Sequence, residues 1–255
     1  MNYNKLKEQW KIDEEKSFKG WDFSYLDNRW EEEKLPWDYK EILQGYLKPH
    51  YNLLDMGTGG GEFLLSLKHP YKNTSITESW KPNIELCKEK LKPLGITVKE
   101  VIDDDNLPFE DNTFDIIINK HASYSMKEVK RILKPNGIFI TQQVGGSNNE
   151  ILSKRLIKDF LPQYKCWNLD YALNEFNINK FQVLYKNEYF PYLHFYDVGA
   201  VVYFAKIIQW EFPGFTVDNA FNELCKMYEE LKVKSYIESY EHRFIIIGKN
   251  FKIID

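Results

Sequence analysis

The chain has 255 residues, with 34 Lys and Arg against 38 Asp and Glu, and its formal net charge is −4. This balance excludes a strongly basic nucleic-acid-binding protein, and a hydrophobic content of 43% excludes a largely disordered chain. Aromatic residues make up 16% of the chain, a content that suits both cores and aromatic-lined pockets.

The first 46 residues are polar and rich in Trp, and they predict a cap of short helices and loops. From residue 51 to about 142, short β-rich runs alternate with helical or loop segments. Such alternation predicts a parallel sheet with crossover connections. The expected strands are NLLDM (52–56), NTSIT (73–77), ITVKEVI (96–102), FDIIIN (114–119) and GIFITQ (137–142).

A helix is expected over 125–133, because Ser125 followed by Glu128 forms a capping box, and KPNG at 134–137 ends it. After residue 143 the pattern loosens, and a segment as long as 191–241 exceeds an ordinary connection between neighbouring strands. The elements expected there are helices at 149–161, 167–177, 197–210 and 217–232 and strands at 181–190 and 242–249.

Together these patterns predict an α/β fold with a Rossmann-like, doubly wound sheet, mostly parallel with an antiparallel last strand. We expect an N-terminal helical cap over 1–46 and one domain over 47–255. That domain is interrupted at about 143–166 and 191–241 by insertions, the second helical and placed before the last strand, which we interpret as lids over the site.

The strongest local signal is LDMGTGGGEF, where an apolar strand runs into glycines 57, 59, 60 and 61 and then into a helical pattern. Glycine allows backbone angles closed to other residues and lets the chain approach a ligand without a Cβ atom. A tight structural turn is the alternative. Four glycines in five positions are costly in chain entropy, which favours a nucleotide-like ligand at this turn.

The spacing separates the possible ligands. An NAD fingerprint requires a third glycine where this chain has Glu62, and no G-K-[ST] of a P-loop follows. The pattern acid-x-G-x-G-x-G formed by Asp55, Gly57, Gly59 and Gly61 resembles motif I of the class I S-adenosylmethionine-dependent methyltransferases. The resemblance implies that S-adenosylmethionine is the cofactor, bound also by Thr58, with S-adenosylhomocysteine as product.

Further landmarks of that family extend the resemblance to about residue 145. Glu78 ends the second strand and corresponds to the acid that holds both ribose hydroxyls. VIDDDNLPF resembles the loop that reads adenine, which implies Asp103 and Asp104, with Asp105 as the alternative if the register differs by one. Ser79 and Trp80 are expected on the other side of the adenine, although Trp80 could equally be a packing residue.

The fourth and fifth strands end in polar residues. Asn119 is expected beside the methionine end of the cofactor, and His121 is the candidate proton acceptor, with a structural, hydrogen-bonded histidine as the alternative. Tyr124, Gln142 and Gln143 are candidate substrate contacts, because ligands bind outside the carboxyl ends of strands in open α/β sheets.

Methyl transfer from a sulfonium needs positioning and exclusion of water more than a catalytic motif. The aromatic accessory segments favour a small-molecule acceptor, in a pocket lined by Trp21, Tyr25, Trp37 and His194 besides the residues above. These aromatics could instead form a core that supports a dimer. RNA or protein as acceptor remains an alternative, and so does a non-catalytic protein that only binds S-adenosylmethionine.

The partners expected from the sequence are few. Nucleic acid is disfavoured because the Lys cluster at 88–92 alternates with Glu89, and no apolar run approaches the roughly 20 residues of a membrane span. Three widely spaced cysteines predict neither disulfides nor a metal site. We therefore expect a cytoplasmic methyltransferase, monomeric or homodimeric, without metal or membrane partner.

Overall fold

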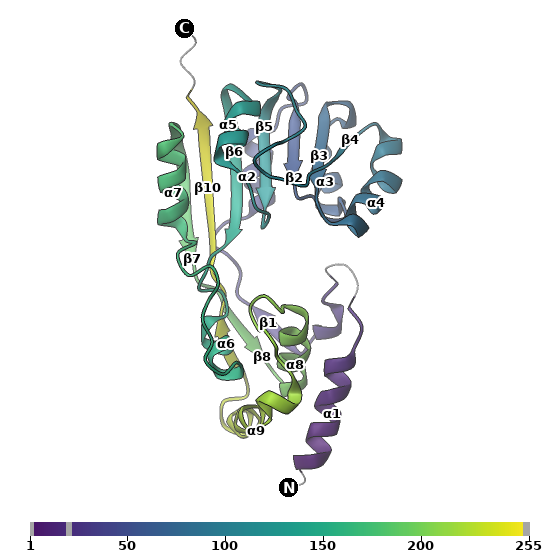
Figure 1. The fold of residues 1–255 in the computed structure, drawn as a ribbon, viewed down its shortest axis with the longest axis vertical. Coiled ribbons are helices and arrows are strands. Elements are labelled where there is room, and N and C mark those ends of the chain that lie inside the picture. Colours follow the sequence, from purple (N-terminus) through teal and green to yellow (C-terminus); the bar gives the residue numbers. More distant parts are fainter. Residues whose placement is uncertain (1–2, 19–21, 252–255) are drawn as a thin grey trace. The chain divides into compact units, whose positions relative to one another are not determined.

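The computed structural model describes residues 3–18 and 22–251, and the chain divides into two compact units (Figure 1). We call them the sheet unit and the aromatic unit. The sheet unit comprises Pro36–Val144, Cys166–Glu188 and Arg243–Asp255. The aromatic unit comprises Met1–Leu35, Gly145–Lys165 and Tyr189–His242.

The sheet unit contains a seven-stranded sheet in the order β4-β3-β2-β5-β6-β10-β7. The strands are β2 (Leu53–Met56), β3 (Thr74–Glu78), β4 (Thr97–Glu100), β5 (Phe114–Lys120), β6 (Leu133–Val144), β7 (Phe181–Tyr189) and β10 (Arg243–Asn250). Strands β4, β3, β2, β5 and β6 pair in parallel, and β10 runs antiparallel to β6. The predicted Rossmann-like sheet with an antiparallel last strand is confirmed.

Helices cover both faces of this sheet (Figure 1). On one face, side chains of α5 and α7 join those of the sheet in one apolar core. Phe176, for example, stacks on Phe139 with 5.7 Å between the ring centroids. The helical elements are α2 (Tyr39–Tyr46), α3 (Glu62–Ser66), α4 (Lys81–Lys90), α5 (Met126–Ile132), α7 (Leu169–Ile178) and the 3-10 turns η2 (Tyr71–Asn73) and η3 (Lys92–Leu94).

Helix α5 begins after Ser125 as predicted, but the capping box is wrong. The Ser125 side chain makes no capping hydrogen bond. Glu128 instead accepts from the guanidinium of Arg131 at 2.7 Å and from the Leu107 backbone N–H at 2.8 Å. Because Glu128 is the partner of an arginine and of the preceding loop, its carboxylate turns away from the start of its own helix.

The aromatic unit contains a three-stranded antiparallel sheet, β1-β8-β9, packed against helices. Trp30, Phe195 and Ile237 face each other across the three strands and join the unit's apolar core. Its elements are α1 (Tyr3–Glu15), η1 (Ser24–Leu26), β1 (Trp30–Glu32), α6 (Glu150–Leu156), β8 (Tyr192–Phe195), α8 (Val198–Ile207), α9 (Val217–Lys234) and β9 (Ile237–Tyr240).

The purely helical cap and insertion expected from the sequence are therefore wrong in one respect, because both contribute strands. Strands β1, β8 and β9 have only three or four residues each. A run as short as Trp-Glu-Glu shows too little alternation to predict a strand. These strands form because neighbours far away in the sequence complete the sheet.

A partly buried ion-pair cluster joins distant parts of the aromatic unit. The Arg29 guanidinium donates to Asp13 Oδ1 at 3.1 Å and to both carboxylate oxygens of Asp197, at 2.7 and 2.9 Å. Asp197 also accepts from Ala200 N and thereby caps α8. A Cβ atom on Gly199 would lie 2.2 Å from Asp13 Oδ2, so a side chain there would displace the Asp13 carboxylate from the cluster.

The boundary of the cap requires a correction. Residues 36–46, which we assigned to the cap, belong to the sheet unit. Trp37 and Tyr39 are buried there and donate hydrogen bonds to β6 and β5, at Gln142 Oε1 and the Asn119 carbonyl. Polar bonds to two central strands hold this segment on the sheet. Within residues 3–18 and 22–251, no helix is both long and apolar enough to span a membrane.

Candidate functional site

The glycine loop that follows β2 requires glycine for both conformation and space. Gly57, Gly59 and Gly61 have φ of 69°, 64° and 82°, in the left-handed region that other residues rarely adopt. A Cβ atom on Gly57 would lie 2.4 Å from the Ala122 Cβ, whereas one on Gly59 would meet no atom within 4 Å. The loop is therefore packed at Gly57 and leaves bare backbone beside open space at Gly59.

Asp55, the acid of the motif, lies buried one residue before the end of β2. Its Oδ2 accepts a hydrogen bond from Thr58 Oγ1 at 2.6 Å, which fixes the first turn of the loop. Burial raises the pKa of Asp55 to about 7; the Thr58 hydrogen bond opposes this rise and the nearby charge of Glu78 adds to it. Asp55 thus anchors the loop to the end of β2 through Thr58.

Glu78 ends β3, and its carboxylate is directed toward the glycine loop. One oxygen accepts from Gly59 N at 2.9 Å, and the other accepts from Ser79 N at 2.9 Å and Trp80 N at 3.2 Å. Glu78 is 7% exposed. The structure therefore brings together the two features that the sequence separates by 17 residues, in an arrangement that suits a ligand with vicinal hydroxyls.

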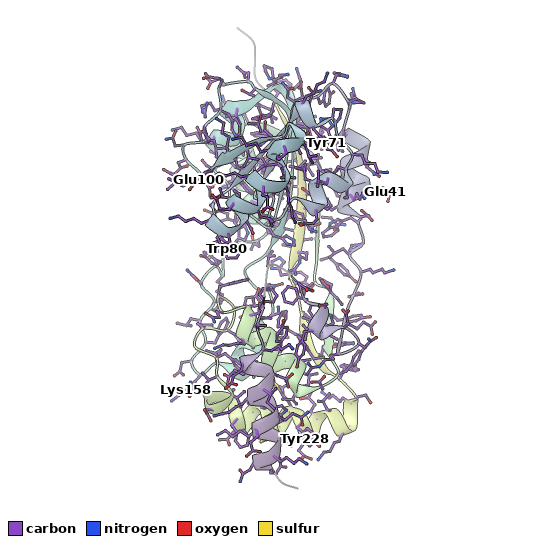
Figure 2. All side chains as sticks on the ribbon, turned by 90° about the vertical axis from the view of Figure 1, so that its right-hand side faces the viewer. Glu41, Tyr71, Trp80, Glu100, Lys158 and Tyr228 are labelled. Carbon is purple, nitrogen blue, oxygen red and sulfur yellow. The ribbon has the colours of Figure 1, made fainter. Side chains whose placement is uncertain are left out.

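The residues expected around an adenine lie next to Glu78. The acidic loop starts beside it, since Val101 N donates to the Glu78 carbonyl at 3.0 Å. Asp103 is exposed and accepts from Asp105 N at 2.9 Å, whereas Asp104 is half-buried. Trp80 is 54% exposed (Figure 2), so its ring is not part of the core.

The end of β5 carries a buried polar network. Asn119 is fully buried, and its Oδ1 accepts from Thr141 Oγ1 at 3.1 Å and from the Gln143 amide. Its Nδ2 has no hydrogen-bond partner among the residues that the structure describes. A buried donor left unpaired costs about 1–3 kcal/mol. Such a cost is recovered when a ligand supplies the acceptor, so this amide and the open space at Gly59 fit a polar cofactor.

The segment after β5 is held by the two glutamines of β6. His121 has φ of 61°, and its N–H donates to the Gln142 carbonyl at 2.8 Å. The Gln142 Nε2 lies 3.2 Å from His121 Nε2, and Gln143 Nε2 donates to the Ala122 carbonyl at 3.1 Å. Both glutamine side chains are buried and engaged within the unit. They position the histidine segment against Gly57.

Tyr124, a third predicted substrate contact, packs its ring against Phe139 and Trp167 at the margin of the apolar core. Tyr39 was not among the residues predicted from the sequence. Its ring stacks on Phe63 at 5.6 Å, and its hydroxyl donates to the Asn119 carbonyl at 3.0 Å. The available signal was the helix start Asp38-Tyr39, because Asp38 caps α2 through Glu41 N.

The remaining pocket candidates are not in the sheet unit. Trp21 lies outside the described residues. Tyr25 belongs to the aromatic unit, where its hydroxyl donates to Asp13 at 2.8 Å. His194 lies in β8 of the same unit, with its ring between those of Tyr192 and Tyr236, at 4.1 and 3.9 Å between centroids.

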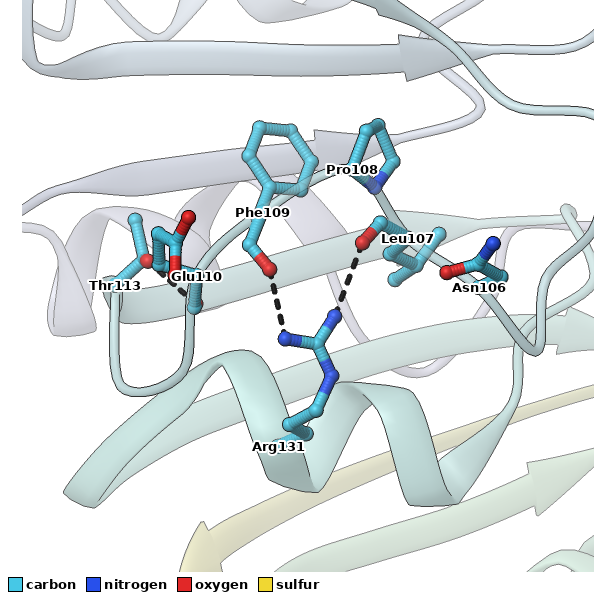
Figure 3. Close-up of a pocket in the computed structure, with 7 residues that line it drawn as sticks. All are labelled: Asn106, Leu107, Pro108, Phe109, Glu110, Thr113 and Arg131. Carbon is cyan, nitrogen blue, oxygen red and sulfur yellow. Dashed lines mark hydrogen bonds between the residues drawn. The ribbon is translucent and has the colours of Figure 1, made fainter.

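A hollow of about 530 Å³ lies in the sheet unit, away from the glycine loop (Figure 3). It is lined by Asn106–Glu110, Thr113 and Arg131, next to the first residue of β5 rather than its carboxyl end. Arg131 donates to the carbonyls of Leu107 and Phe109 at 3.0 and 2.7 Å. With these bonds and its pair with Glu128, Arg131 has a structural role in fastening the loop.

Similarity to known proteins indicates the family of this chain independently of the site geometry. Residues 54–141 match the family model of a methyltransferase domain. The chain is 24% identical to the MJ0638 protein of Methanocaldococcus jannaschii, over 78% of this chain and 91% of that protein. It is 33% identical to the phthiotriol/phenolphthiotriol dimycocerosates methyltransferase of Mycobacterium tuberculosis, but this match spans only 36% of each chain.

Among solved structures, the BH2331 protein of Bacillus halodurans shares the fold, with a TM-score of 0.56 and 12% identity over 84% of this chain and 99% of that chain. The matched family segment contains the glycine loop, Glu78 and the buried network at Asn119. The cofactor of this family is S-adenosylmethionine. Residues 54–141 are therefore a methyltransferase domain, and the sheet that carries them has the Rossmann-like fold of the class I S-adenosylmethionine-dependent enzymes.

Proposed function

We propose that this protein transfers the methyl group of S-adenosylmethionine to a small-molecule acceptor, with the cofactor on the glycine loop and its ribose on Glu78. The observation on which this proposal chiefly depends is the hydrogen bond between Gly59 N and Glu78, which places a carboxylate at the bare backbone of the loop. The unpaired amide of Asn119 supports a further polar contact to the cofactor.

The cofactor supplies an activated methyl group on a sulfonium, which needs no covalent help from the protein. The contribution of this chain is to bind and to orient. Gly57, Gly59 and Glu78 hold the nucleoside part, Asn119 takes the amino-acid part, and Trp80 with Asp103 and Asp104 bounds the adenine. His121, held by Gln142, is the polar side chain that we assign to the acceptor.

A small-molecule acceptor is supported by the chemistry of the aromatic unit. On one face of its sheet, Glu31, His194 and Glu238 stand opposite one another across the three strands. Tyr192 donates its hydroxyl to Glu31 at 2.9 Å, and His194 lies 3.2 Å from Glu238. Carboxylates repel phosphates, so this face does not suit a nucleic-acid backbone. We propose that it contributes to recognition of the acceptor.

The cofactor assignment is tested by calorimetric titration with S-adenosylmethionine, S-adenosylhomocysteine and NAD. We expect the first two to bind with similar affinity and NAD not to bind. Absence of binding by both sulfur compounds would contradict the proposal. S-adenosylmethionine binding without methyl transfer to any acceptor would point to a protein that uses the molecule only as a ligand.

The acceptor class is tested by incorporation of a labelled methyl group from S-adenosylmethionine into a cell extract, separated into small molecules, RNA and protein. We expect label in the small-molecule fraction. Label in RNA or protein would overturn the acceptor class and leave the cofactor assignment intact.

The role of the aromatic unit requires point variants, because a deletion of residues 1–40 would remove Arg29, Trp37 and Tyr39 and disturb both units. We expect His194→Ala to leave cofactor affinity unchanged and to lower transfer to the natural acceptor. Tyr228→Phe, on the outer helix α9, is the matched control. Wild-type transfer in the His194 variant would place acceptor recognition elsewhere.

A further inference from the structure

Three side chains of the sheet unit form a hydrogen-bonded chain beside the carboxyl ends of β5 and β6. The indole N–H of Trp37 donates to Gln142 Oε1 at 2.8 Å. The amide nitrogen of the same glutamine lies 3.2 Å from His121 Nε2. Trp37 and Gln142 are buried, at 9% and 3% exposure, so water does not compete for the bond between them. His121 is exposed and forms the surface end of the chain.

The chemistry of the three groups fixes the direction of this chain. An indole N–H can only donate, so the glutamine atom facing Trp37 is the amide oxygen. The other end of the amide is then the NH2 group, which can only donate to the imidazole. His121 Nε2 must therefore be unprotonated and accept this bond. Since a neutral imidazole keeps one proton, that proton is on Nδ1.

The backbone and the surroundings of the ring also favour a fixed, neutral His121 imidazole. The His121 N–H donates to the Gln142 carbonyl, so one residue holds both the main chain and the ring of the histidine. Desolvation of the ring by the groups around it lowers the His121 pKa well below its ordinary value, and the cations Arg243 on β10 and Lys120 on β5 lower it further. A protonated Nε2 would also face an amide NH2 group that cannot accept.

We propose that Trp37 and Gln142 are positioning residues that hold His121 as the neutral tautomer protonated at Nδ1, so that this histidine donates a hydrogen bond to the bound ligand instead of accepting its proton. The proposal rests on the proposed function for the identity of that ligand, the cofactor or the methyl acceptor. It replaces the proton-acceptor role expected from the sequence. It implies an acceptor that does not pass a proton to His121 during methyl transfer.

The direct test is nitrogen NMR of the full-length protein with labelled histidine, with the His121 signals assigned by a His121→Asn variant. In the wild type we expect the Nδ1–H tautomer to persist below about pH 6, under the ordinary histidine pKa. This measurement needs no variant at Trp37 or Gln142. An Nε2–H tautomer, or a ring that protonates with an ordinary pKa, would overturn the proposal.

Two variants test the positioning role. Trp37→Phe frees the Gln142 amide to rotate, and Gln142→Glu replaces the donor by a carboxylate, so both should raise the His121 pKa by about one unit or more. Trp167→Phe changes a tryptophan of the same unit that packs on Tyr124 and Phe244, and it should leave that pKa unchanged. Equal pKa values in the wild type and in both variants would contradict the proposal.

Calorimetric titration of the same samples with S-adenosylmethionine separates this proposal from the proposed function. Failure to bind the cofactor would contradict the proposed function. The NMR spectra would still report the His121 tautomer and so test the positioning role independently. Normal cofactor binding with the wrong tautomer would contradict only the positioning role of Trp37 and Gln142.

Discussion

The two units of this protein use polar side chains in opposite ways. In the sheet unit, buried polar groups such as Asp55, Glu78 and Asn119 gather at the carboxyl ends of parallel strands, where an unpaired amide and bare glycine backbone remain available. In the aromatic unit, Arg29 joins Asp13 to Asp197, and the charges satisfy one another. The first arrangement suits ligand binding. The second links distant segments of the aromatic unit and thereby stabilises its fold.

The largest effect is expected from breaking the Arg29 cluster. Arg29→Ala removes the cation that pairs with buried Asp13 and partly exposed Asp197. A fully buried pair loses about 3–5 kcal/mol in this way, and this partly exposed cluster should lose about 2–3 kcal/mol. Lys7→Ala, which breaks an exposed pair with Asp218, should cost at most about 1 kcal/mol. Denaturant unfolding measures both. Equal losses of unfolding free energy in the two variants would show that the Arg29 cluster contributes no more to stability than an exposed ion pair.

The glycine loop provides the second test. Gly57→Ala and Gly59→Ala both place a side chain in the left-handed region, at a cost of about 1–2 kcal/mol. Only the Gly57 variant also brings a Cβ against Ala122, so it should be clearly the less stable of the two. Gly59→Ala should mainly weaken cofactor binding, because its side chain fills open space. Thermal unfolding and calorimetry distinguish these effects, and the reverse order of stabilities would refute the packing argument.

A third prediction concerns Glu78. Glu78→Gln removes the charge that accepts from Gly59 and from the ribose hydroxyls, so S-adenosylmethionine affinity should fall by about 1–3 kcal/mol. Glu62→Gln, on the adjacent helix and paired with exposed Lys90, should leave affinity unchanged. Both are measured by calorimetric titration. Equal affinity in the wild type and the Glu78 variant would remove the ribose assignment.

The smallest expected effect is the pH dependence of stability that arises from Asp55. Burial raises its pKa from 3.8 to about 7, so between these values the folded protein holds a proton that the unfolded chain releases. Stability from this group is therefore lost as pH rises, by about 1 kcal/mol between pH 5.5 and 6.5. Asp55→Asn should flatten that slope. Urea unfolding at several pH values tests this, and an unchanged slope would exclude Asp55 as its source.

Most of the methyltransferase sheet could be predicted from the sequence, because its strands are apolar, its turns are marked by Gly, Pro and Asn, and each signal is local. The glycine loop was predicted for the same reason, whereas Glu78 was predicted from the resemblance to the methyltransferase family. The capping box at Ser125 failed because the partners of Glu128 are Arg131 and Leu107, and the latter is remote in sequence. Strands β1, β8 and β9 were missed because three or four residues carry almost no periodicity.

The residue types alone predicted the glycine loop, since only glycine adopts its backbone angles without strain. They could not show that Trp37 and Tyr39 belong to the sheet unit, or that Gln142 links Trp37 to His121. These are contacts between residues up to 105 positions apart. A side chain's hydrogen-bond partner depends on which strands lie side by side, and that is a property of the folded chain, in which distant segments share one sheet edge.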